Sequence, residues 1–142
     1  MDQSGIVTVE SRFSVSRTVD RLVEVVQSAG LIVFARIDHG AGARDVGLKL
    51  RPTELLIFGN PKGGTPLMQE RQLAGIDLPV KALAWKDENG KVRLSYNDAE
   101  WIAVRHGLGA ASADAVKAIT AGGGADRRRR RLVDVTAQFR PC

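Results

Sequence analysis

Cysteine is almost absent from the chain: the single one, Cys142, is the last of the 142 residues. A disulfide within the chain is therefore excluded, and no thiolate lies among side chains that would share a metal ion or a redox reaction with it. We expect neither a metal site nor a cofactor.

Long apolar runs are also missing. No segment approaches the roughly 20 apolar residues that cross a bilayer. The first ten residues, MDQSGIVTVE, do not have the basic and then apolar order of a secretory signal. We therefore expect a cytoplasmic protein without a membrane partner.

Acidic side chains are scarce in one part of the chain only. Residues 122–142 hold six arginines and two aspartates, whereas residues 1–121 hold 15 basic and 14 acidic side chains, so most of the net charge of +5 is C-terminal. We expect a single domain over residues 1–121 and a Gly- and Arg-rich tail over residues 122–142 that is disordered or bound to a partner. We do not expect the domain to bind nucleic acid. The exception is the arginine run from Arg127 to Arg131, which would attract phosphates.

The first 40 residues predict a strand, a helix and a second strand. Residues 6–13 alternate between apolar and polar side chains, as half-buried strands do. The helix that follows would be capped by Ser16 and end at Gly30, and residues 31–37 are mostly apolar. Its apolar side has helical spacing and consists of Val15, Val19, Leu22, Val23, Val26 and Ala29. Such a unit predicts two parallel strands joined by a right-handed crossover, with the helix on one sheet face.

The centre of the chain runs from an apolar strand into a glycine-rich turn. Residues 55–58 (LLIF) form an unbroken apolar run, which is typical of a strand covered on both faces. Thr65 followed by Pro66 has the form of an N-cap and first helical residue. We therefore expect the next helix to have Thr65 as its N-cap and Pro66 as its first residue.

That geometry would point unpaired N–H groups and the positive end of a helix dipole at one spot. An anion or a small molecule would bind there, with donors from Asn60, Lys62, Gly63, Gly64 and Thr65. The spacing matches neither a P-loop nor a dinucleotide fingerprint. The alternative is that the two glycines only permit a tight corner.

His39 is the candidate catalytic residue. It follows the second strand and has an ionisable ring, but no local spacing supplies further metal ligands, and a histidine at this position is commonly a turn residue. With Asp38, the turn from Asn60 to Thr65, and Asn97, it would border a shallow pocket.

Two adjacent strands follow with a turn at Asn89-Gly90, the pair that favours a type I′ hairpin. A two-residue loop would put the apolar and aromatic side chains on one face of the ribbon. The pairs that it predicts are Trp85 with Leu94, Leu83 with Tyr96, and Lys86 with Arg93.

Three sequence motifs occur in this order: FGNPKGGTPLM, DLPVKALAW and LSYND. Over residues 6–108 the chain resembles the family catalogued as domain of unknown function 302. The resemblance implies an α+β fold of TATA-binding-protein-like topology, with one strand, a helix, four strands and a helix. Its mostly antiparallel sheet would be covered by helices on one face, and the domain would form homodimers. The resemblance implies no established activity.

Three classes of function fit these observations. The first is a small-molecule or anion binding module in a homodimer. The second is a metal-independent enzyme in which His39 acts as the general base and Lys62 or backbone N–H groups stabilise negative charge. The third is a structural or interaction domain whose apolar strands pair two subunits. A distance beyond about 10 Å between His39 and the glycine turn would exclude a shared substrate atom.

Overall fold

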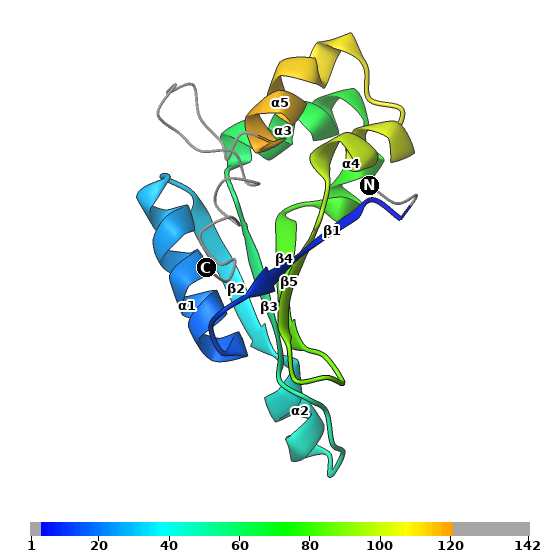
Figure 1. The fold of residues 1–142 in the computed structure, drawn as a ribbon. Coiled ribbons are helices and arrows are strands. Elements are labelled where there is room, and N and C mark those ends of the chain that lie inside the picture. The colour runs from blue at the N-terminus through cyan, green and yellow to red at the C-terminus, as the bar shows by residue number, and fades with distance from the viewer. Residues whose placement is uncertain (1–3, 121–142) are drawn as a thin grey trace.

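The structure is a computed structural model that describes residues 4–120 (Figure 1). The strands are β1 (Ile6–Ser11), β2 (Ile32–Asp38), β3 (Thr53–Gly59), β4 (Val80–Lys86) and β5 (Val92–Asn97). The α-helices are α1 (Val15–Ser28), α2 (His39–Asp45), α3 (Pro61–Glu70), α4 (Ala99–Arg105) and α5 (Ala113–Thr120). Two 3₁₀ helices, η1 (Gln72–Asp77) and η2 (Ala110–Ser112), follow α3 and α4. The predicted tail, with Arg127 to Arg131, lies outside the described residues.

The five strands form one sheet in the order β1-β5-β4-β3-β2, and every neighbouring pair is antiparallel. The prediction of an α+β fold with an antiparallel sheet is confirmed. β1 and β2 run in the same direction, as predicted, but they form opposite edges of the sheet. In Figure 1, α3, α4 and α5 gather beyond one end of the sheet, and α2 lies beyond the other end.

Helix α1 packs on one sheet face and forms the main core. Its buried side chains Val19, Leu22 and Val26 meet side chains from the three central strands, namely Leu56, Phe58, Ala82, Ala84, Leu94 and Tyr96. The N-cap is Ser14, whose hydroxyl accepts the N–H of Arg17 at 3.2 Å, so the prediction of Ser16 was wrong. The helix begins earlier because Val15 is itself a core residue.

The register of the β4–β5 hairpin differs by one residue from the prediction. Asp87 accepts the N–H groups of Asn89 and Lys91, both at 2.9 Å, and this lengthens the loop beyond two residues. Trp85 therefore pairs with Arg93. A shift of one residue reverses the face on which every side chain lies. The predicted apolar face is thus divided between the two sides of the sheet.

The face opposite α1 carries apolar side chains that are partly exposed. Leu83 and Trp85 alternate with the buried Ala82 and Ala84 and so point away from α1. In β3, Leu55 and Ile57 are likewise partly exposed, whereas Leu56 and Phe58 are buried. The prediction that β3 is covered on both faces is therefore wrong.

Candidate functional site

Helix α3 begins five residues earlier than the sequence predicts. Its N-cap is Asn60 and its first residue is Pro61, so Gly63, Gly64 and Thr65 lie within the helix and do not form a turn before it. The chain offers two consecutive cap-proline pairs, and the first one starts the helix, because the Asn60 side chain accepts the N–H of Lys62 at 3.0 Å.

The amides that were expected to bind an anion are bonded within the chain. Gly63 and Gly64 donate their N–H groups to the Asn60 carbonyl at 2.8 and 3.0 Å. Lys62 donates to the Asn60 side chain, and Pro61 has no N–H. The expectation of free amide donors at this corner is therefore wrong.

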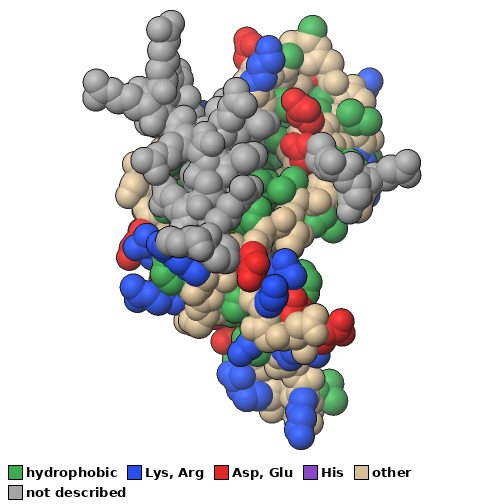
Figure 2. Space-filling model, in the orientation of Figure 1, with side chains coloured by type: hydrophobic (Ala, Val, Ile, Leu, Met, Phe, Trp, Pro, Cys, Tyr) green, Lys and Arg blue, Asp and Glu red, His purple; other side chains and the backbone are tan. Residues whose placement is uncertain are grey.

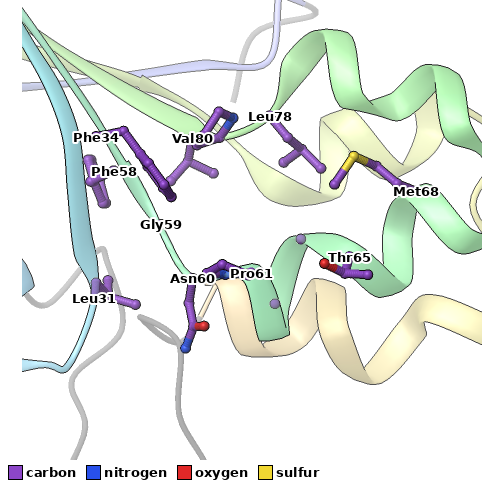
Figure 3. Close-up of a pocket in the computed structure, with 13 residues that line it drawn as sticks. Leu31, Phe34, Phe58, Gly59, Asn60, Pro61, Thr65, Met68, Leu78 and Val80 are labelled. Carbon is purple, nitrogen blue, oxygen red and sulfur yellow. The ribbon is translucent and has the colours of Figure 1, made fainter.

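A pocket of about 230 Å³ nevertheless opens beside the start of α3 (Figure 3). Its walls come from β2, β3, α3 and the segment that leads into β4. The lining residues are Leu31, Phe34, Phe58, Gly59, Asn60, Pro61, Gly63, Gly64, Thr65, Met68, Leu78, Pro79 and Val80. Most of these side chains are apolar, so the pocket suits an apolar molecule.

Four of the five predicted binding residues border this pocket: Asn60, Gly63, Gly64 and Thr65. Lys62 is exposed and is not among the lining residues. The polar groups on the wall are the Asn60 amide and the Thr65 hydroxyl, both on the α3 side in Figure 3. Whether these residues bind a ligand stays a prediction.

His39 lies at the other end of the sheet. In the β2–β3 register Ile32 is opposite Gly59, and Asp38 is opposite Glu54. Five residues of β3 separate Glu54 from Gly59, so the two ends of the strand pair are roughly 17 Å apart at 3.4 Å per residue. Asp38 accepts the N–H of Ala41 at 2.9 Å and caps α2. The predicted pocket shared by His39 and the glycine turn is therefore wrong, and with it the combined acid-base site.

The apolar walls were not predicted as a site. Phe34 is positioned by an irregularity in the β2–β3 register between Val33 and Ala35. Leu78 and Val80 come from the chain that enters β4. The sequence segment that forms part of these walls is DLPV, and it contributed only to the family resemblance. Asn97, which was expected at the pocket, does not line it.

Glu70 fixes the far end of α3. Its carboxylate accepts the Gly109 N–H at 2.8 Å and the buried Ser112 hydroxyl, and these two bonds, the hydroxyl first, lower the pKa of Glu70 below its usual 4.5. These contacts connect α3 to the segment that leads into α5.

A lowered pKa in the folded state makes the contribution of Glu70 to stability greatest above pH 4.5 and removes it as the pH falls further. We expect Glu70→Gln to lower the free energy of unfolding at pH 7 and to make its fall in acid less steep. Urea unfolding of both proteins between neutral pH and pH 3 measures this. Equal acid slopes for the two proteins would contradict the assignment.

Two kinds of site are absent from residues 4–120. No group of three or more His, Cys, Asp or Glu side chains there is arranged to hold a metal ion. No helix in the same part of the chain has the length and apolar character to span a bilayer.

Several known proteins resemble the chain. It is 55% identical over 121 residues to "Fluoride-specific ion channel FluC 1" of Brucella suis biovar 1 (strain 1330) and to its namesake of Brucella abortus biovar 1 (strain 9-941). The match covers 85% of this chain but 48% and 45% of those proteins, so the chain spans about half the length of the curated relatives it matches. The crystal structure of an uncharacterized conserved DUF302 protein from Bacillus stearothermophilus superposes with a TM-score of 0.74 at 21% identity, over 96% of this chain and 98% of that one.

The superposition covers nearly the whole of both chains, and at that identity it shows a shared fold. The family model described as "Domain of unknown function DUF302" matches residues 7–122, which include all the described strands and helices except Ile6, the first residue of β1. The chain therefore belongs to the DUF302 family.

Proposed function

We propose that this domain binds a small apolar molecule in the pocket beside α3. The observation that carries the proposal is the lining: aromatic, aliphatic and sulfur side chains around a volume of about 230 Å³. That is about one and a half times the volume of an apolar cavity known to hold benzene. A single aromatic ring or a short branched chain would fit.

The polar end of such a ligand would face Asn60 and Thr65. The Asn60 oxygen is occupied by Lys62, while its amide nitrogen has no hydrogen-bond partner within residues 4–120. The Thr65 side chain is exposed at the same wall. These groups would orient a ligand, and the apolar walls would supply most of the affinity.

Small inorganic anions fit this pocket poorly. An ion that leaves water needs donors or an opposite charge, and the nearby amides already donate to Asn60. This reasoning extends to fluoride, the ion in the printed names of the Brucella relatives. We propose that this domain holds a different ligand, and fluoride then serves as a negative control.

Blocking the pocket should abolish binding. A Cβ at Gly64 would lie 3.8 Å from Leu78, an ordinary contact, so Gly64→Leu should fill the pocket without breaking the helix. We expect indole to bind the full chain in calorimetric titrations and its affinity to fall by about tenfold or more in Gly64→Leu, since the leucine takes the ligand's place.

The matched control is Gly42→Leu. Gly42 also lies in a helix, and a Cβ there meets no atom within 4 Å. This variant should bind indole as the wild type does. The proposal is wrong if indole does not bind the wild type, or if Gly64→Leu binds it equally well.

A further inference from the structure

A second feature lies at the end of the sheet opposite the pocket. Helix α2 and the residues after it project beyond the sheet in Figure 1. We call residues 44–51 the tip. The chain returns from it into β3 at Thr53.

The tip exposes three large apolar side chains. The exposed fractions are 71% for Val46, 65% for Leu48 and 50% for Leu50. They are spaced two residues apart and lie within one short segment. Single exposed apolar side chains are ordinary in proteins, but a contiguous group of them marks an interaction surface.

The backbone holds these side chains in place. Gly47 has φ +76° and donates its N–H to the Arg44 carbonyl at 3.0 Å, and Leu48 donates to the Ala43 carbonyl at 2.9 Å. This pair of bonds is the Schellman motif that ends helices. Farther along, the Arg51 side chain donates to the Lys86 carbonyl at 3.2 Å and ties the tip to β4. The apolar side chains are thus presented in a defined conformation.

Basic side chains alternate with the apolar ones. Arg44, Lys49 and Arg51 are exposed, and Asp45 is the one acidic residue within residues 44–51. Figure 2 shows blue and green side chains side by side at this lower end of the molecule. Apolar groups that insert, surrounded by cations that meet phosphates, are what an anionic lipid surface selects.

We propose that the tip docks on an anionic lipid surface, with Val46, Leu48 and Leu50 entering the headgroup region and Arg44, Lys49 and Arg51 meeting lipid phosphates. This contact requires no spanning helix. A second copy of the chain fits the tip less well, because a stable dimer buries about 800 Å² on each partner, from 20 to 30 residues. The eight residues of the tip are too few for that, and their net positive charge would repel a copy of itself.

The test is flotation of the full chain with vesicles of phosphatidylcholine alone or mixed with phosphatidylserine. We expect binding to the mixed vesicles, weaker binding to the neutral ones, and a loss of about tenfold or more in the triple variant Val46→Ser/Leu48→Ser/Leu50→Ser. The matched control is Leu73→Ser/Val104→Ser, which removes side chains that are 74% and 81% exposed elsewhere. This control should bind as the wild type does.

Insertion of the tip into the bilayer can also be measured by fluorescence quenching. Purely electrostatic attraction of arginines to the membrane surface would not produce this signal. In Leu48→Trp, vesicles with bromine atoms on the acyl chains should quench the new fluorescence, measured as the difference from wild type, which has two tryptophans of its own. The proposal is overturned if the triple variant floats as the wild type does, or if the quenching is absent. It is also overturned if sedimentation shows that the wild type is a dimer and that the triple variant is a monomer.

Discussion

Replacement of Gly5 by alanine should lower the free energy of unfolding by about 3 kcal/mol. Gly5 is buried at φ +73°, and a Cβ there would lie 2.1 Å from Cγ of Trp101. Its carbonyl also accepts the Asp98 N–H at 2.8 Å, so the backbone cannot move without loss of a bond at the start of α4. The indole ring would have to leave its position. Urea unfolding of the two proteins measures the difference.

Gly107→Ala separates the clash from the backbone conformation. Gly107 has φ +63°, but a Cβ there meets no atom within 4 Å. This variant should cost about 1 kcal/mol, the strain of a non-glycine residue in the left-handed region. Equal losses of stability in the two variants would show that Trp101 moves without cost, contrary to its close contact with Gly5.

Arg36→Met should cost about 3 kcal/mol, because it leaves the buried Glu54 without its cation. Arg36 lies on β2, and its guanidinium donates to Glu54 at 3.0 Å, to Asp20 at 2.6 Å and to the Ser16 carbonyl at 3.0 Å. The Glu54 side chain is 11% exposed, so water compensates little for the loss. Urea unfolding at pH 7 gives the magnitude.

The double variant Arg36→Met/Glu54→Met provides the stricter test. Replacing both members of a buried pair with apolar side chains is often nearly neutral, so the double variant should be more stable than Arg36→Met alone. Arg44→Met is the matched surface change, since Arg44 makes no ion pair within residues 4–120. A double variant less stable than the single one would contradict the assignment.

The sequence predicted α1 well because its signal is periodic. Apolar residues at helical spacing face one side over 14 residues, and one wrong cap does not change that face. The strands were also found, since runs of apolar or alternating residues set them. Sheet order came from the family resemblance, because long-range pairing has no local signature.

Errors occurred where two local signals compete. Asn60-Pro61 and Thr65-Pro66 both satisfy the rule for a helix start, and only the Asn60 side-chain bond to Lys62 decides between them. In the hairpin, the Asp87 side chain changes the loop and shifts the register. Each choice depends on side-chain hydrogen bonds that residue types alone do not specify.

Four of the five predicted binding residues border the pocket, but the chemistry expected of that corner was wrong. The glycines were assigned to a turn with free amides, whereas in α3 they are helical and their missing side chains leave room beside Leu78. His39 was grouped with them because both follow strands. Antiparallel pairing of β2 with β3 separates His39 from the glycines, since consecutive antiparallel strands finish at opposite ends of the sheet.

The homodimer and the cytoplasmic location stay predictions. Substitutions on the sheet face opposite α1, at Leu55, Ile57, Leu83 and Trp85, can test whether two subunits pair through it. It is separate from both the pocket and the tip.

Binding in the apolar pocket is measured most directly at the side chain of Met68, which lines it. The chain has two methionines, Met1 and Met68, so ¹³C-methyl labelling gives two resonances and an internal reference. During titration with indole, the Met68 methyl resonance should move and saturate, because the ring current of a bound aromatic acts at close range, while fluoride and phosphate should leave it in place. A Met68 resonance that is unmoved by indole, or that moves only with phosphate, would contradict the apolar pocket as the functional site.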